Sequence, residues 1–338
     1  MRFFNIPIFI PELACPFRCV YCNQYNISGR VSLPDKEEII NIITSHLETI
    51  PGDNRHVEIA FFGGSFTGLS LEQQNYYLDL ILPFIESEQV AGVRISTRPD
   101  YIDAKTLENL KKHHVRSVEL GAQSLNDEVL KKSGRGHTAQ QVLDATKMLK
   151  EEGFETGLQM MTGLPGDNEE KAIDTAQKIC AVGAHTTRIY PTLVIKDTPL
   201  EMLFQQGRYK PQTLEAATDL CARLHQIFNP SGVKILKTGL HPSESFQTGN
   251  KLVAGPFHNA FGEMVRSKVY LNMFKESIKD RKGKNIVIRV HPGSLNSAIG
   301  HRSVNKLWLM EKFRVVRFIA DPKLQKEKYT LEMPEEYR

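Results

Sequence analysis

The sequence predicts an α/β fold with a parallel sheet, namely a partial (β/α)6 barrel of the TIM type followed by a small C-terminal α/β appendage. Short apolar segments alternate with helical patterns as far as about residue 241. The helical patterns have apolar residues three and four positions apart, as amphipathic helices do. A stretch rich in Gly, Pro and Ser then interrupts the alternation, which indicates a domain boundary.

Six apolar segments are predicted to be strands, at residues 5–10, 57–62, 93–97, 117–120, 155–160 and 186–190. Between the first two, Ile39, Ile43 and Leu47 have helical spacing. A complete barrel has about eight strand–helix units, so six units predict an open barrel. A further helix is expected at 211–228, and a strand or its remnant at 233–238.

The boundary is expected within residues 239–256, so that residues 1–241 form the barrel and residues 242–338 the appendage. In the appendage we expect helices at 263–279 and 303–313 and strands at 286–290 and 315–320. Segments dense in His, Gly and polar residues lie at 255–259, 291–296 and 300–303. They form ordinary turns, close over a substrate, or bind phosphate near a helix that Ser303 caps.

The composition is that of a globular protein, with 41% hydrophobic and 24% charged residues. The net charge of +4 is unevenly distributed, because residues 266–328 contain 16 Lys and Arg against 5 Asp and Glu, a net of +11. Such a segment is either a solvated surface or a binding surface for an anionic partner, of which RNA is the first candidate.

No apolar run is long enough for a membrane span, and the N-terminal run, interrupted by Pro7 and Pro11, does not resemble a signal peptide. The 5 cysteines form no disulfide-like pattern. We therefore expect a cytoplasmic protein without membrane contact, in which Cys180 and Cys221 are ordinary buried thiols.

Three cysteines, Cys15, Cys19 and Cys22, follow the first predicted strand. Three thiolates at this spacing bind three of the four irons of a 4Fe-4S cluster and leave the fourth iron to a non-protein ligand. The alternatives are a structural zinc site, which prefers four tetrahedral ligands, and three unrelated thiols. No fourth cysteine lies nearby, so the cluster is favoured.

Distinctive polar and glycine residues follow each predicted strand, where the working residues of parallel α/β folds gather. Gly63, Gly64 and Ser65 follow the second strand, and the two glycines let backbone approach a ligand closely. Gln123 follows the fourth strand, and Gly163 and Leu164 follow the fifth. The alternative for any one of these segments is a structural turn.

Together these motifs resemble the radical S-adenosylmethionine (SAM) superfamily, in which the open iron chelates the amino and carboxylate groups of SAM. The resemblance implies that the Gly63–Gly64–Ser65 loop holds the methionyl amino group. The segment from Glu119 to Asp127, followed by residues 134–138, resembles oxygen-independent coproporphyrinogen oxidases and the elongator catalytic-subunit family. It implies that Gln123 and Arg135 line the SAM site, Arg135 facing the carboxylate.

The same resemblance assigns the adenine side of SAM to Gly163 and Leu164, with Met160, Met161 and the ring of Tyr21 beside them. For the methionines the alternative is core packing, and for Tyr21 it is shielding of the cluster. Glu119 either adds a polar contact or is a buried carboxylate bonded to the backbone. Gln159 stands where the porphyrinogen oxidases tend to have an acidic ribose-binding residue, so no ribose contact is assigned.

Residues 188–200 and 207–211 resemble the elongator catalytic subunit, which modifies wobble uridines of tRNA with acetyl-CoA. The resemblance covers about residues 5–241, without that family's acetyltransferase domain and with a shorter gap between the first two cysteines. It implies a radical SAM enzyme that forms a 5′-deoxyadenosyl radical, acts in tRNA modification, and takes electrons from a donor such as flavodoxin or ferredoxin. The alternatives are a radical SAM enzyme for a small metabolite or peptide and a non-catalytic haem chaperone.

Overall fold

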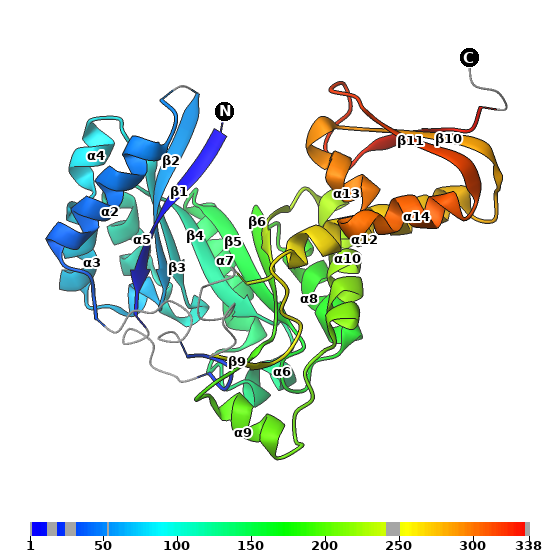
Figure 1. The fold of residues 1–338 in the computed structure, drawn as a ribbon. Coiled ribbons are helices and arrows are strands. Elements are labelled where there is room, and N and C mark those ends of the chain that lie inside the picture. Colours follow the sequence, from blue (N-terminus) through cyan, green and yellow to red (C-terminus); the bar gives the residue numbers. More distant parts are fainter. Residues whose placement is uncertain (1, 12–18, 24–31, 53, 241–250, 335–338) are drawn as a thin grey trace. The chain divides into compact units, whose positions relative to one another are not determined.

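The computed structural model describes residues 2–11, 19–23, 32–52, 54–240 and 251–334 (Figure 1). The chain forms two compact units. Unit 1 comprises residues 1–213 and 228–257, and unit 2 comprises residues 214–227 and 258–338.

Unit 1 is built on a seven-stranded sheet whose order follows the chain, with every neighbouring pair parallel. Its strands are β1 (Arg2–Ile10), β2 (Arg55–Gly63), β3 (Gly92–Thr97), β4 (Val115–Gln123), β5 (Glu155–Thr162), β6 (Thr186–Pro191) and β8 (Lys234–Thr238). This order is that of a partial (β/α) barrel, so the predicted fold class is confirmed. The seventh strand is the expected remnant at 233–238.

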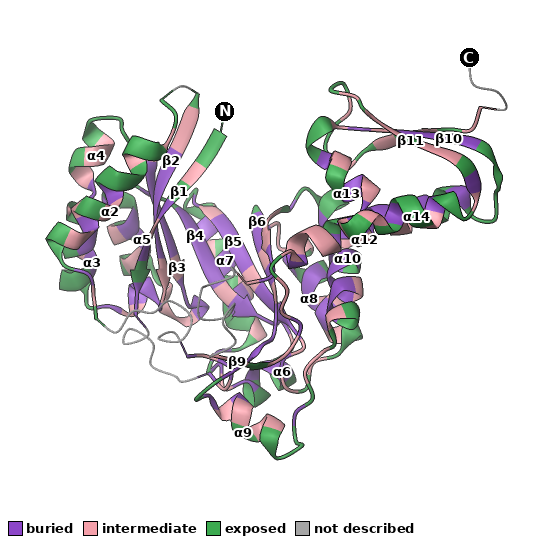
Figure 2. Ribbon diagram, viewed as in Figure 1, coloured by how far each residue is buried: buried purple, intermediate pink, exposed green. Residues whose placement is uncertain are grey.

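The sheet is strongly curled. The ammonium group of Lys234 on β8 lies 4.7 Å from the centre of the Phe3 ring on β1, although these strands form opposite edges of the sheet. On β1, Ile6, Ile8 and Ile10 are at most 1% exposed. This alternation places one face of β1 in the core. In the central strands of the sheet buried residues predominate (Figure 2).

Short polar side chains cap the N-termini of most helices of unit 1. The helices of this unit are α2 (Lys36–Thr49), α3 (Leu71–Asp79), α4 (Leu82–Glu86), α5 (Ala104–Lys112), α6 (Asp127–Lys132), α7 (Ala139–Glu151), α8 (Glu169–Ala181) and α9 (Pro199–Gln205). Ser70 and Thr138 form complete capping boxes at α3 and α7. Asn126 and Asn168 cap α6 and α8, so the chain turns into a helix soon after β4 and β5 end.

A small two-stranded sheet moves the expected domain boundary. β7 (Val194–Ile195) pairs antiparallel with β9 (Leu252–Ala254), which keeps the chain as far as residue 257 with unit 1. The first part of α10 (Leu214–Ser231) belongs instead to unit 2. The boundary expected at 241/242 is therefore corrected to 257/258, because a two-residue strand carries too little pattern to be recognised in sequence.

Unit 2 packs α12 (Phe261–Ile278), α13 (Leu295–Ile299) and α14 (Val304–Met310) with a three-stranded sheet. The sheet order is β11 (Phe313–Ala320), β10 (Gly283–Val290) and β12 (Tyr329–Glu332), with β10 parallel to β11 and antiparallel to β12. Its core joins Tyr270 and Phe274 of α12 to Ile286, Ile288 and Val290 of β10.

Both predicted strands and both predicted helices of the appendage are therefore present, although α14 is shorter than the helix expected at 303–313. Among the described residues no helix is long and apolar enough to cross a membrane.

Candidate functional site

Cys19 and Cys22 lie in one tight turn at the carboxyl edge of the sheet. The amide of Cys22 donates to the carbonyl of Cys19 at 3.1 Å. Val20 anchors the turn, because its amide donates to Ser133 and its carbonyl accepts from Leu200. Cys15 lies outside the described residues, so the structure places two of the three predicted cluster ligands. Thiolate sulfurs are the donors that iron–sulfur clusters take, so this set fits a 4Fe-4S cluster.

Arg135 is the residue that joins this turn to the sheet. Its Nη1 lies 3.2 Å from Cys19 Sγ and 3.4 Å from the hydroxyl of Tyr21, and its Nη2 donates to the carbonyl of Gly121 at 2.6 Å. The side chain is buried, although it carries a permanent positive charge. A guanidinium held beside a cysteine sulfur can stabilise a thiolate.

His137 accompanies Arg135 and accepts a hydrogen bond from its Nε at 3.2 Å. Burial, together with the positive charge of Arg135, lowers the pKa of His137 to about 4. The imidazole is therefore neutral near pH 7, as an acceptor at Nε2 requires. His137 lies within the motif at residues 134–138 but was not predicted to have a role; its position two residues after Arg135 was the available signal.

Tyr21 and Leu164 belong to one buried cluster. It also contains Cys19, Met161 and Tyr209, so the cysteine turn packs directly on the end of β5 and the segment after α9. Burial raises the pKa of Tyr21 well above its usual range, so the phenol remains protonated. The apolar side of the site predicted from Tyr21, Met161 and Leu164 is thus one contiguous surface, whereas Met160 is fully buried elsewhere in the core.

The turn after β5 is closed by Asp167, another residue that the sequence reasoning did not single out. Asp167 Oδ2 accepts from the amide of Gly163 at 2.8 Å, and the hydroxyl of Tyr209 donates to the carbonyl of Gly163 at 2.6 Å. Burial raises the pKa of Asp167 to about 6. Gly163 has a φ of 73°, a conformation that favours glycine, so this turn needs it.

The loop after β2 is defined by close backbone contact with the end of β1. A Cβ on Gly63 would lie 2.4 Å from the carbonyl oxygen of Ile10, and one on Gly64 would lie 2.4 Å from that of Pro11. These glycines therefore let Ile10 and Pro11 at the end of β1 pass directly beside the end of β2. The hydroxyl of Ser65 bonds Thr97 Oγ1 at 2.8 Å, so this group is engaged within the protein.

Gln123 ends β4 at an irregularity in its pairing with β5. Its φ is 63°, an uncommon value for a residue other than glycine, and its Oε1 accepts from Gln159 Nε2 at 3.2 Å. A Cβ on Gly121 would lie 3.1 Å from both Gln123 Nε2 and Arg135 Nη2. The predicted pair Gln123 and Arg135 thus lies together, with Gly121 between them.

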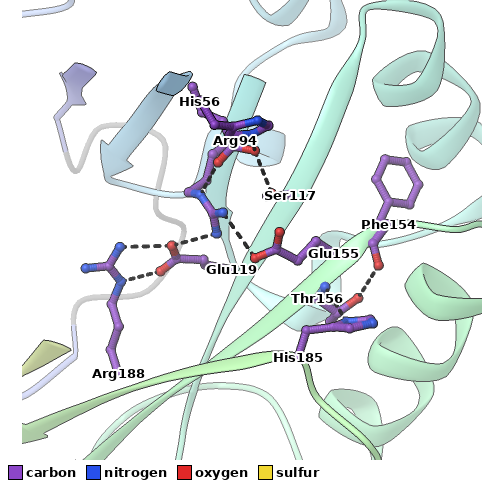
Figure 3. Close-up of polar contacts among 10 residues, drawn as sticks. His56, Arg94, Ser117, Glu119, Phe154, Glu155, Thr156, His185 and Arg188 are labelled. Atoms are coloured by element: carbon purple, nitrogen blue, oxygen red, sulfur yellow. Dashed lines mark hydrogen bonds and ion pairs between the residues drawn. The ribbon is translucent and has the colours of Figure 1, made fainter. Parts of the chain in front are cut away.

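Deeper in the sheet, Glu119 belongs to an ion-pair network (Figure 3). Glu119 accepts two hydrogen bonds from Arg188, at 2.5 and 2.9 Å, and one from Arg94 at 3.3 Å. Arg94 also pairs with Glu58 and Glu155. The carboxylate of Glu119 is therefore held by guanidinium groups, rather than by the backbone as one alternative had it. Arg188, the first residue of the elongator-like segment, was not recognised as its partner.

The described site residues meet at the carboxyl edge of the sheet. One connected set contains Cys19, Tyr21, Gln123, Arg135 and Leu164. The Gly63–Gly64 loop adjoins it through the end of β1, which leads into the cysteines. The arrangement provides thiolates, one buried cation and an apolar wall, which suits a cofactor that has a charged end and a flat apolar end.

Comparison with known proteins gives two family matches. Residues 10–179 match the radical SAM superfamily, and residues 184–270 match the radical SAM C-terminal domain. The chain is similar to Elongator complex protein 3 of Schizosaccharomyces pombe, with 32% identity over 201 residues that cover 58% of this chain and 36% of the relative. It is also similar to the tRNA uridine(34) acetyltransferase of Dehalococcoides mccartyi, with 24% identity over 261 residues that cover 67% of this chain and 56% of the relative.

The chain thus spans between about a third and just over half of the length of these relatives. Among solved structures, the archaeal Elp3 of Methanocaldococcus infernus with an N-terminal deletion shares the fold. The two structures match with a TM-score of 0.63 and 23% sequence identity, and the match covers 83% of this chain and 66% of the Elp3 chain. Because the first family match covers half of the sequence, from the end of β1 into α8, the chain belongs to the radical SAM superfamily of enzymes, which use a 4Fe-4S cluster and SAM.

Proposed function

We propose that this enzyme binds one 4Fe-4S cluster through Cys15, Cys19 and Cys22, cleaves SAM, and acts in tRNA modification. The observation that carries the proposal is the buried guanidinium of Arg135, 3.2 Å from Cys19 Sγ at the carboxyl edge of the sheet. When bound, the cluster and SAM would supply a 5′-deoxyadenosyl radical that abstracts a hydrogen atom from the substrate. The electron would come from a cytoplasmic donor such as flavodoxin or ferredoxin.

The chain's own residues bind and orient the cofactor. The positive charge of Arg135 attracts the carboxylate of SAM. Backbone carbonyls of the loop at Gly63 and Gly64 accept hydrogen bonds from the amino group. Gln123 contributes an amide next to Arg135. The neutral imidazole of His137 accepts from Arg135 Nε and so sets the plane of the guanidinium without adding a second charge.

The apolar cluster of Tyr21, Met161 and Leu164 supplies the wall for the adenine and excludes water. A dry surrounding strengthens each charged contact of Arg135. Positioning of SAM and exclusion of solvent are therefore the tasks that these residues perform, while the cofactor carries the reactive chemistry.

A tRNA substrate is supported by two independent observations. The relatives described above include a tRNA uridine(34) acetyltransferase, and residues 266–328 of this chain carry a net charge of +11. Since the chain spans only part of those relatives, the proposal is limited to the radical step on tRNA and does not extend to acetyl transfer.

The experiment is anaerobic SAM cleavage with and without tRNA. The reconstituted protein is incubated with dithionite and SAM, and 5′-deoxyadenosine is quantified by mass spectrometry. We expect formation of 5′-deoxyadenosine that rises when unmodified tRNA is added. A peptide or metabolite extract that stimulates the reaction while tRNA does not would contradict the tRNA substrate, and stoichiometric haem binding without SAM cleavage would indicate a haem carrier.

A further inference from the structure

The turn between α13 and α14 of unit 2 is an unusual piece of backbone. It comprises Gly300, His301, Arg302 and Ser303. It joins the two short helices of the connection that leads from β10 to the parallel strand β11. Gly300 has a φ of 93°, Arg302 of 54° and Ser303 of 62°. The side chain of Ser303 makes no capping hydrogen bond to α14, so the prediction that Ser303 caps this helix is wrong. Capping therefore does not account for the left-handed backbone of the turn.

Buried polar contacts hold the turn in place from below. Asn305, which is fully buried, donates through Nδ2 to the carbonyls of Ser267 at 2.8 Å and Ala298 at 3.2 Å. The hydroxyl of Ser267 accepts from the amide of His301 at 2.8 Å. A Cβ on Gly300 would lie 2.8 Å from the amide nitrogen of Asn305. The turn is thus fastened to α12 and α13, and its outer side chains are presented by a defined backbone.

Cationic and apolar side chains adjoin the turn on the surface. Arg302 and Lys306 are exposed, and no hydrogen bond or ion pair within the described part of the chain engages their side chains. On α14, Val304, Leu307 and Met310 lie three residues apart and are 48%, 57% and 52% exposed. Residues 300–310 contain no Asp or Glu. We call Arg302, Val304, Lys306, Leu307 and Met310 the turn–helix face.

This combination is that of a surface for single-stranded RNA. Cations neutralise phosphates, and exposed apolar side chains contact unstacked bases. K-homology domains clamp about four nucleotides with a Gly-x-x-Gly loop, which this turn resembles with Ser303 in place of the second glycine. A protein partner would also cover apolar residues, but two exposed cations that no ion pair engages within the described residues favour a polyanion.

We propose that the turn–helix face binds single-stranded RNA, with Arg302 and Lys306 on the phosphates and Leu307 against a base. The inference rests on the proposed tRNA substrate and names the surface of unit 2 that would hold an unpaired loop or end of that RNA.

The test is fluorescence anisotropy of the full-length protein with a labelled 12-nucleotide oligouridylate, over a series of KCl concentrations. The double variant Arg302→Ala/Lys306→Ala should bind about tenfold more weakly at moderate salt. The slope of log affinity against log salt should fall by about 1.4, since each phosphate contact to a single strand contributes about 0.7. Leu307→Ser should weaken binding at every salt concentration and leave the slope unchanged.

The matched control is Lys282→Ala/Lys284→Ala, which removes the same charge from exposed positions of unit 2 and should leave both affinity and slope nearly unchanged. Equal losses in the two double variants would overturn the inference in favour of diffuse charge attraction. Unchanged RNA affinity of Leu307→Ser, with altered sedimentation of the protein, would assign the face to self-association and also overturn it.

Formation of 5′-deoxyadenosine is measured in the same preparations. Suppose that the wild type cleaves SAM and responds to tRNA, and that Arg302→Ala/Lys306→Ala binds the oligonucleotide as tightly as the wild type does. The RNA-binding role of the turn–helix face is then refuted, while the proposed function stands. If tRNA has no effect on SAM cleavage and binds nowhere at low salt, the proposed substrate fails as well.

Discussion

Arg135 Nη1 lies 3.2 Å from the sulfur of Cys19, so one buried guanidinium connects the cysteine turn to the strand ends. The same side chain reaches the carbonyl of Gly121 and the imidazole of His137. Burying a charge costs free energy unless nearby groups compensate it. Apolar packing alone would not require a cation at this position. The sulfur of Cys19, the hydroxyl of Tyr21 and the carbonyl of Gly121, all within hydrogen-bond distance of the guanidinium, compensate part of that cost.

Replacement of Arg135 should weaken SAM binding without loss of the cluster. Arg135→Ala removes a charged hydrogen bond, worth about 1.5 to 3 kcal/mol, which corresponds to a rise of about 10- to 150-fold in the dissociation constant. Isothermal titration of the anaerobic protein measures it, with iron content as the check on the cluster. The exposed Lys131→Ala is the control and should bind SAM normally. An unchanged constant in Arg135→Ala would remove this residue from the site.

The close approach of β1 and the β2 loop predicts a steric effect at Gly64. In Gly64→Ala the new methyl group would lie 2.4 Å from the carbonyl oxygen of Pro11, so the segment leading to the cysteines must shift. We expect a loss of about 1 to 3 kcal/mol in the free energy of unfolding, together with incomplete cluster assembly. Gly52→Ala, which meets nothing within 4 Å, should be nearly neutral. Full stability and iron content in both variants would refute the contact.

Two of the three carboxylates that pair with Arg94, those of Glu119 and Glu155, should differ sharply in their effect on stability. The side chain of Glu119 is 4% exposed and also pairs with Arg188, whereas that of Glu155 is 41% exposed. Glu119→Ala leaves the partly buried guanidinium of Arg188 without its carboxylate and removes one of three from Arg94, so it should cost about 3 to 5 kcal/mol in the free energy of unfolding. Glu155→Ala should cost less than about 1 kcal/mol. Denaturant unfolding measures the free energy of unfolding of both variants. Similar losses in the two would contradict the larger contribution expected of Glu119.

Asp167 should make stability depend on pH. Burial raises its pKa to about 6 in the folded chain, from a usual value of 3.8. The folded state therefore favours the protonated acid, and this stabilisation is present below about pH 4 and is lost as the pH rises through about 6. A pKa shift of about two units changes the free energy of unfolding by about 3 kcal/mol at most between these pH values.

In Asp167→Asn this dependence should disappear. The measurement is the difference in the free energy of unfolding between wild type and Asp167→Asn, at intervals from pH 4 to pH 7. A difference that stays constant over this range would show that Asp167 titrates normally.

The parallel barrel was predictable because its strands are continuous apolar segments separated by amphipathic helices. All six expected strands are present, and β8 occupies the expected remnant. β7, β9 and β12 were not predicted, since strands of two to four residues take their stability from tertiary pairing and leave little pattern. For the same reason the domain boundary was placed too early.

The site was predictable only in part. Motif residues at strand ends identified Arg135 and Gln123, because parallel strands bring their carboxyl ends together. The partners that define their geometry, such as His137 and Asp167, were missed because hydrogen bonding and burial, which shift their pKa values, depend on the folded surroundings. The same holds for Arg188, whose carboxylate partner lies 69 residues earlier in the chain.

The central claim, a cluster with an open iron that binds SAM, is tested most directly by electron paramagnetic resonance of the dithionite-reduced protein with and without SAM. The account predicts the signal of a reduced 4Fe-4S cluster whose shape changes when SAM is added. In the triple variant with Ala at Cys15, Cys19 and Cys22 the signal should be absent. A cluster signal that SAM leaves unchanged, a signal that persists in the triple variant, or stoichiometric zinc in place of iron would contradict it.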